Sequence, residues 1–109
     1  MAVRRFGDII KIRPEGLAEY KKWHANPMPG VNEMISACHL RNYSIYSRGD
    51  YLFAYYEYDG DDFEADMAKM AADPTTQKWW DVVKPLMQPL EDRNEGDFWS
   101  SMQEIYHLD

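Results

Sequence analysis

The chain of 109 residues has few of the features that mark secreted, membrane or disulfide-rich proteins. Its single cysteine, Cys38, has no partner for an internal disulfide, and no N-terminal apolar run followed by a cleavage site is present. The longest apolar stretch is far shorter than the roughly 20 residues that a membrane-spanning helix requires. These shortages favour a cytoplasmic protein with no membrane partner.

Positive charge is also scarce. Twelve Lys and Arg residues stand against 19 Asp and Glu residues, so the formal net charge is −7. The only basic group, "VRRF" at residues 3–6, is too small to neutralise many phosphates. No nucleic-acid partner is expected, and a neutral or cationic ligand is easier to accommodate than an anionic one.

Aromatic residues, by contrast, are plentiful: four Trp, eight Tyr and four Phe make up 15% of the chain. Trp and Tyr combine a large apolar surface with a hydrogen-bond donor, which suits sugar and other small-molecule pockets. The length, together with the absence of repeats, low-complexity segments and linkers, predicts a single domain over residues 1–109.

Hydrophobic periodicity predicts alternating strands and broken helices. The expected strands are residues 3–12, 40–47, 51–59 and 100–108, and the expected helices are 15–26, 31–40, 61–73 and 74–85. This order reduces to βαββαβ, the ferredoxin-like α+β pattern of a four-stranded antiparallel sheet with helices on one face. The strand at 51–59 is apolar on both faces, so the face away from the helices is expected to meet a ligand or a partner subunit.

Motifs for metal or cofactor chemistry are absent. The histidines His24, His39 and His107 lack metal-ligand spacing, and a lone cysteine offers no thiolate pair. Cys38 beside His39 is expected to be a small buried residue, because sequence neighbours do not face each other on a helix. The sequence therefore predicts no metal and no cofactor.

Acid–base chemistry has better support. Tyr20 and His24 are four residues apart on a predicted helix, so their side chains are neighbours. An imidazole titrates near neutral pH, which suits proton transfer, although a Tyr and a His in an ordinary core would show the same spacing. Trp79 and Trp80 point about 100° apart on a helix. One ring is expected to pack in the core, and the spacing leaves open whether the other packs there too or covers the apolar face of a sugar ring.

Four segments in order, "EYKKWH", "RNYSIY", "TTQKWW" and "MQEIYHL", resemble the L-rhamnose mutarotase family, and the resemblance runs from end to end. It implies a ferredoxin-like fold paired into a dimeric α+β barrel, and interconversion of the α and β anomers of a 6-deoxyhexose without metal or cofactor. By the same resemblance His24 is the catalytic proton donor. Tyr20, Tyr43, Trp79 and Trp80 are substrate-binding residues. One ring of the tryptophan pair is then expected to face the pocket directly, while the other anchors the helix and closes the pocket's edge.

The chain departs from the family in one segment. Met28-Pro29-Gly30 stands where a Trp-Pro-Glu-like segment is usual, which leaves the preferred sugar open between L-rhamnose and L-fucose. The same barrel type also includes cofactor-free and haem-degrading monooxygenases, so fold alone does not decide the function. A binding module that senses a sugar without accelerating any reaction is the third reading. The second acid/base group is not identified by the sequence.

Overall fold

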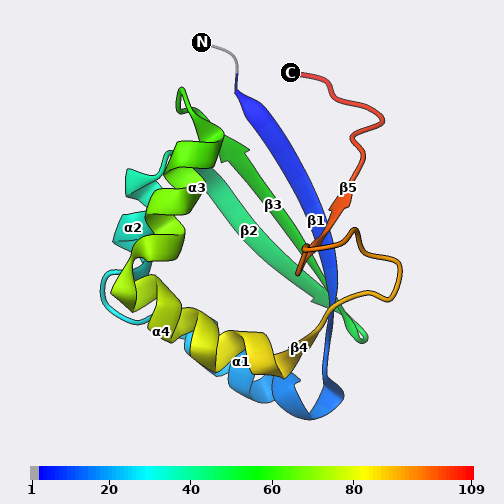
Figure 1. Ribbon diagram of the computed structural model, residues 1–109. Helices are drawn as coiled ribbons and strands as arrows, with labels where there is room; N and C mark the ends of the chain where they lie inside the picture. Colours follow the sequence, from blue (N-terminus) through cyan, green and yellow to red (C-terminus); the bar gives the residue numbers. More distant parts are fainter. Residues whose placement is uncertain (1–2) are drawn as a thin grey trace.

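The computed structural model describes residues 3–109 as a curved antiparallel sheet whose concave side is spanned by helices (Figure 1). The chain runs through β1 (Arg4–Ile12), a 3₁₀ turn (Pro14–Gly16), α1 (Leu17–Ala25), α2 (Val31–Ala37), β2 (Leu40–Arg48), β3 (Tyr51–Tyr58), α3 (Phe63–Ala72), α4 (Pro74–Val83), a second 3₁₀ turn (Lys84–Leu86), β4 (Met87–Gln88) and β5 (Ser100–Met102). The predicted α+β class is confirmed, and the four α-helices and strands β1, β2, β3 and β5 follow one another in the predicted order.

The strand order is β2-β3-β1-β4, and β5 also pairs with β1. All these pairings are antiparallel, as the ferredoxin-like pattern requires. The position of the fourth strand is therefore filled by two short strands, β4 and β5, separated by the loop of residues 89–99.

The predicted strand at 100–108 is wrong in its extent, because β5 ends at Met102. Beyond that residue the tail is held by a side-chain contact instead of a strand ladder: the Arg5 guanidinium donates to the Glu104 carboxylate at 3.0 Å. β4 was not expected, because the polar run at residues 88–98 predicts a loop; Met87 and Gln88 nevertheless pair with Ile12 and Lys11 of β1.

Two aspartates begin the helices α3 and α4. Asp73 is followed by Pro74, a sequence that predicts a helix cap, and it caps α4 by accepting hydrogen bonds from the Thr76 N–H at 2.9 Å and the Thr76 hydroxyl at 2.8 Å. The spacing of Asp61 and Glu64 predicts a capping box that begins at Asp61, but this prediction is wrong by one residue, because Asp62 accepts from the backbone N–H of Ala65.

The core lies between the sheet and the helices. Ile10, Ile12 and Leu52 are almost fully buried there, and they pack in one cluster with Val31 and Val83. On the opposite face of the sheet Tyr46 is 67% exposed and Tyr51 is 38% exposed. The helix-covered face thus forms the core, and the outer face presents aromatic rings to solvent.

A β-bulge interrupts β2 between Arg41 and Ser44, where three steps along β2 match two steps along β3. Asn42 adopts a positive φ of 51° at this point, a conformation that Asn tolerates better than most residues. The extra residue reverses the alternation, so that Leu40 before the bulge and Ile45 after it both face the helices. Tyr43, two residues before Ile45, is aimed the same way.

No helix within residues 3–109 combines the length and the apolarity needed to cross a membrane.

Candidate active site

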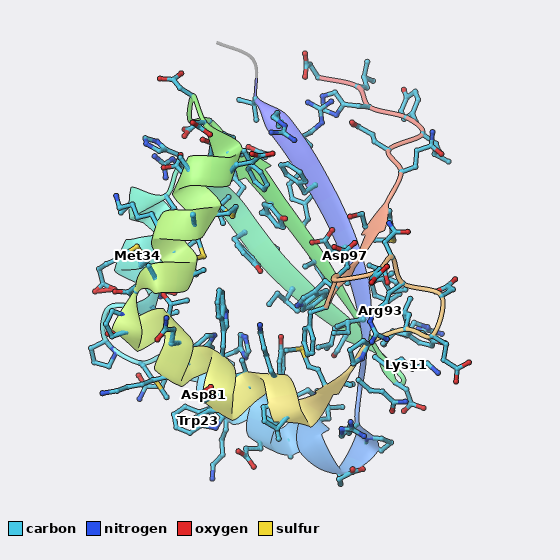
Figure 2. The ribbon with its side chains drawn as sticks, viewed as in Figure 1. Lys11, Trp23, Met34, Asp81, Arg93 and Asp97 are labelled. Carbon is cyan, nitrogen blue, oxygen red and sulfur yellow. The ribbon has the colours of Figure 1, made fainter. Side chains whose placement is uncertain are left out.

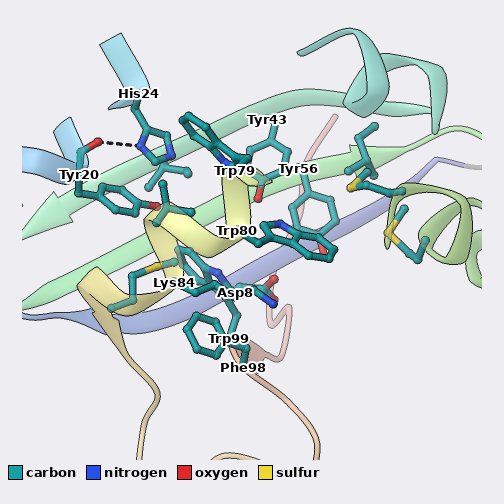
Figure 3. A pocket seen from close by; sticks show the side chains of 16 residues that line it. Asp8, Tyr20, His24, Tyr43, Tyr56, Trp79, Trp80, Lys84, Phe98 and Trp99 are labelled. Atoms are coloured by element: carbon teal, nitrogen blue, oxygen red, sulfur yellow. Dashed lines mark hydrogen bonds between the residues drawn. The ribbon is translucent and has the colours of Figure 1, made fainter. Parts of the chain in front are cut away.

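A cavity of about 240 Å³ lies between the sheet and the helices, with aromatic rings on several sides (Figure 3). Its walls come from every layer of the fold: Asp8, Tyr20, His24, Leu40, Tyr43, Ile45, Tyr56, Met67, Met70, Trp79, Trp80, Val83, Lys84, Met87, Phe98 and Trp99. The volume is near the lower end for small-molecule sites and suits a compact ligand. The cavity is on the helix-covered face, whereas the sequence left the opposite face for a ligand or a partner.

A second hollow, of about 560 Å³, shares His24, Tyr43 and Trp79 with this cavity and extends along α2. His24 therefore stands where two hollows meet. A group at such a junction can reach a ligand in the cavity and remain accessible to solvent.

His24 is oriented by the turn of helix that precedes it. Its Nδ1 lies 2.8 Å from the backbone carbonyl oxygen of Tyr20, and its ring stacks on the Tyr20 ring with centroids 4.1 Å apart. A carbonyl oxygen only accepts, so Nδ1 carries the hydrogen in the neutral imidazole. The spacing of four residues thus holds the imidazole through the Tyr20 backbone and ring, leaving the Tyr20 hydroxyl free for other contacts.

The free nitrogen of His24 is Nε2, which has no hydrogen-bond partner among residues 3–109. Burial lowers the pKa of His24 below its ordinary value of 6.5, and the bond to the Tyr20 carbonyl opposes part of that shift. At neutral pH the imidazole is consequently uncharged and presents an unprotonated Nε2 that can accept a proton.

Trp79 and Trp80 both line the cavity. Trp79 is also part of the core: it is 8% exposed, belongs to the core cluster, and meets the His24 ring edge-on at 5.0 Å. Trp80 is less buried and faces the other part of the cavity, where the Lys84 ammonium lies 4.3 Å from its ring centroid. Both indole rings extend from α4 into the cavity (Figure 3).

Two tyrosines from the sheet form the floor. The Tyr43 ring stacks on the Tyr56 ring with centroids 5.1 Å apart. Crowding of its hydroxyl by protein atoms, with a smaller effect of the Asp8 carboxylate, raises the pKa of Tyr43 to about 12, although 41% of the whole residue is exposed. Burial likewise raises the pKa of Tyr20 and of Tyr56. All three phenols are protonated at neutral pH and act as neutral hydrogen-bonding groups.

Asp8 contributes the only carboxylate in the described lining of this cavity, and the sequence analysis did not single it out. Burial raises its pKa, a hydrogen bond from the Tyr56 hydroxyl opposes that shift, and Asp97 adds to it. A signal was available: Asp8 interrupts the apolar row of Phe6, Ile10 and Ile12, which shares one face of β1. An acid in such a row is costly without a partner or a function.

The five site residues predicted from the sequence, Tyr20, His24, Tyr43, Trp79 and Trp80, all lie in the lining of this one cavity. Asp8, Tyr56, Lys84, Phe98 and Trp99 join them.

The residues for which the sequence analysis predicted no role in the site lie outside the lining of the cavity. Cys38 is buried, with its Sγ 3.6 Å from the Met34 sulfur, and burial raises the pKa of its thiol. His39 is exposed and lies 3.4 Å from the Asp59 carboxylate. Met28, in the segment that departs from the family pattern, packs against the core cluster. Within residues 3–109 no three His, Cys, Asp or Glu side chains are grouped so as to hold a metal ion.

Comparison with known proteins matches a family model described as L-rhamnose mutarotase to residues 5–108. An L-rhamnose mutarotase of Ligilactobacillus salivarius is 32% identical over 96% of this chain and 97% of its own length. The structure of an L-rhamnose mutarotase from Formosa agariphila superposes with a TM-score of 0.75 at 21% identity, covering 97% of this chain and 99% of that one. Tetracenomycin F2 cyclase of Streptomyces glaucescens shares the fold at a TM-score of 0.66 and 18% identity, with 97% of each chain covered.

Proposed function

This chain belongs to the L-rhamnose mutarotase family. We propose that it is an isomerase that interconverts the α and β anomers of a 6-deoxyhexose, with L-rhamnose as the main substrate. The observation that carries the proposal is the unpartnered Nε2 of His24 at a cavity walled by aromatic rings. The related cyclase shows that the fold also serves other chemistry, so the proposal rests on the site and on the family and not on the fold.

The reaction needs only a proton relay. Ring opening removes the proton of the anomeric hydroxyl, places a proton on the ring oxygen and breaks the bond from C1 to that oxygen. The aldehyde then rotates and closes on its other face, which reverses the proton movements. Both oxygens are bonded to C1 in the closed sugar, so one group beside C1 can serve both. No proton is gained or lost over the cycle.

His24 is proposed as that group. Its neutral Nε2 takes the anomeric proton, and the resulting imidazolium is the proton donor to the ring oxygen. The Tyr20 carbonyl, 2.8 Å from Nδ1, keeps the ring in place through both steps. A bound water or a second group serves equally well for one of the two transfers, and a single acid/base group already contributes roughly 10²–10⁴-fold.

The remaining predicted residues are proposed to hold the sugar. The hydroxyls of Tyr20 and Tyr43 are neutral donors and acceptors for sugar oxygens. Trp79 and Trp80 cover the apolar C–H surfaces of the ring. Met67 and Met70, on α3, add an apolar wall suited to the methyl group that distinguishes a 6-deoxy sugar. L-Fucose has the same methyl group and is the alternative substrate.

We also propose that the protein is a cytoplasmic homodimer whose subunits meet through the outer face of the sheet. Tyr46 and Tyr51 are exposed on that face, and Phe53 lies between them and pairs with Ile9 across the strands. Light scattering coupled to size exclusion tests the association. A wild-type protein of monomer mass, or a Tyr46→Glu variant that keeps the dimer mass, contradicts this interface.

The activity is tested by saturation-transfer NMR at the anomeric protons of L-rhamnose and, separately, L-fucose. Exchange between anomers that exceeds the spontaneous rate with the wild-type protein, and that is lost in His24→Ala, is the expected result. Wild-type protein that accelerates neither sugar refutes the proposed function. A faster exchange for L-fucose than for L-rhamnose would keep the reaction and change the substrate.

A further inference from the structure

The cavity has two chemically distinct ends. His24 and Tyr20 stand at one end, on α1, while Asp8 lies at the other, on β1, near Phe98 and Trp99 (Figure 3). β1 and β2 are not neighbours in the sheet, because β3 lies between them. Neighbouring strands are about 4.8 Å apart, so Asp8 on β1 and Ile45 on β2 are separated by about two such spacings. Ile45 and His24 both line this cavity, so the distance from Asp8 to the His24 end is comparable to the length of a sugar ring with its hydroxyls.

Protein contacts leave part of the hydrogen-bond acceptor capacity of the Asp8 carboxylate free. The Tyr56 hydroxyl interacts with it and lowers its pKa, and the carboxylate makes no ion pair within residues 3–109. A carboxylate has about four acceptor positions, and one phenol can occupy only one of them. The nearby ammonium of Lys84 is engaged elsewhere, 4.3 Å from the centroid of the Trp80 ring and 5.2 Å from that of Phe98. Acceptor capacity of Asp8 is therefore left facing the cavity.

The support beneath Asp8 is rigid. Asp8 lies opposite Ala54 in the middle of the β1–β3 ladder, and the Tyr56 ring that contacts it is stacked between Phe6, at 4.9 Å, and Tyr43, at 5.1 Å. A carboxylate fixed in this way by a strand and a stacked phenol can distinguish the directions of hydroxyl groups. A mobile surface acid cannot, since it would adjust to any ligand.

We propose that Asp8 is a specificity-determining residue whose carboxylate accepts hydrogen bonds from the hydroxyls on C3 and C4 of the pyranose while C1 lies at His24. This inference rests on the proposed function. It follows from the shape of a six-membered ring, in which C4 is opposite C1: a sugar with its anomeric carbon at His24 extends C3 and C4 toward the far end of the cavity. Asp8 is there, so it contributes to affinity and to the choice between sugars, not to the proton transfers.

The prediction has a direct bearing on the open choice of substrate. L-Rhamnose and L-fucose differ in configuration at C4 as well as at C2, so a carboxylate directed at C4 meets an equatorial hydroxyl in one and an axial hydroxyl in the other. Hydrogen bonds to a charged group are among the stronger ones in proteins and are strongly directional. Asp8 thus supplies discrimination that flat aromatic walls lack.

The test compares wild-type protein with Asp8→Asn on L-rhamnose and on its 2-deoxy, 3-deoxy and 4-deoxy analogues, by anomeric exchange at varied sugar concentration. Asn has nearly the same shape, so the strand and the Tyr56 contact are preserved. Asp8→Asn is expected to raise the KM for L-rhamnose roughly 10- to 100-fold with kcat within about threefold, because a charge-assisted bond is lost from binding. Asp97→Asn is the matched control: Asp97 is exposed on the loop before β5, contributes the same charge near Asp8, and is absent from the cavity lining (Figure 2).

The decisive readout is the coupling between the residue and each hydroxyl. Removing the C3 or C4 hydroxyl should raise the wild-type KM and leave the KM of Asp8→Asn nearly unchanged, while removing the C2 hydroxyl should affect both proteins equally. Equal losses in both proteins for all three analogues overturn the inference, and coupling to C2 alone overturns the proposed orientation. A fall in kcat at constant KM would instead make Asp8 part of the proton transfer and would also overturn it. Wild-type protein inactive on every sugar would refute the proposed function itself.

Discussion

The sharpest prediction concerns the removal of the His24 imidazole. In His24→Ala the cavity keeps its aromatic walls but loses the nitrogen that exchanges protons with the sugar. General acid–base groups typically contribute 10²–10⁴-fold, so kcat should fall by about that factor. KM should change much less, because the tyrosines and tryptophans proposed to bind the ring remain. The fall corresponds to roughly 3–5 kcal/mol of transition-state stabilisation, at about 1.36 kcal/mol per factor of ten.

The fold should tolerate this change. His24 is only partly buried, and the single hydrogen bond that it makes in the described chain is the 2.8 Å contact to the Tyr20 carbonyl. Losing one such bond costs about 0.5–1.5 kcal/mol, a minor part of the stability of a domain of this size. The Tyr20 carbonyl remains an acceptor within the helix. A loss of activity would consequently report on chemistry and not on unfolding.

The assay is saturation transfer between the anomeric protons of L-rhamnose, with the spontaneous rate subtracted. Lys22→Ala is the matched control, since Lys22 is exposed on the same helix and outside the cavity lining. The variant and the control should have the same far-ultraviolet circular dichroism. A His24→Ala protein that retains kcat within threefold of wild type would refute the assignment of His24, whatever the KM.

Three further predictions follow from the site. Because burial lowers the pKa of His24 below 6.5, the kcat/KM profile should be level between about pH 7 and about pH 8 and fall as the pH drops through that lowered value; a rise toward acid would contradict a neutral starting imidazole. Trp79→Ala should cost about 3–5 kcal/mol in urea unfolding and also abolish turnover, whereas Trp80→Ala should cost less stability, since that ring is less buried, and still impair turnover. Asp73→Ala, which removes both hydrogen bonds to Thr76 at the start of α4, should lower the free energy of unfolding by about 0.5–2 kcal/mol in the same assay; no change would show that the cap does not stabilise the helix.

The parts of the fold that periodicity governs were predictable from the sequence. Strand β3 and helix α4 have strong patterns and clear boundary residues, and Asp73 was recognisable as a cap because Pro74 follows it. The end of the last strand was not predictable. Residues 103–108 are compatible with a strand, but they lie beyond β5, where the Arg5 contact to Glu104 replaces the ladder. A local pattern does not show whether a neighbouring strand is available to pair.

The site residues, too, were predictable only where local sequence or a family resemblance identifies them. Tyr20 and His24 were identifiable because their contact is local, one helical turn apart. Trp79 and Trp80 were noticeable as adjacent aromatic residues on a helix, and the resemblance to a family supplied Tyr43. Their convergence on one cavity depends on tertiary structure that spacing does not encode. Which ring of the tryptophan pair faces a bound ligand stays a prediction, because both rings line the cavity.

Asp8 was missed for a different reason. On β1 it occupies a position that strand alternation assigns to the core, and its partner Tyr56 is on another strand, 48 residues further along the chain. The sequence shows the odd acid but gives no indication of what lies opposite it. Only the β1–β3 register brings the carboxylate and the phenol together.

The bulge in β2 makes the pocket depend on how many residues the chain contains, and not only on which ones. Leu40 and Tyr43 face the same cavity because one additional residue separates them. Deleting Asn42 would leave every site side chain in the sequence but remove the extra residue of the bulge. Strand alternation would then place Leu40 and Tyr43 on opposite faces, so one of them, with the part of β2 that it belongs to, would turn to the outer face of the sheet. Substitutions at Asn42 should keep the site intact when the new residue can adopt the same positive-φ backbone conformation. A single-codon deletion there would abolish the site, and an insertion of one residue beside the gap would restore it.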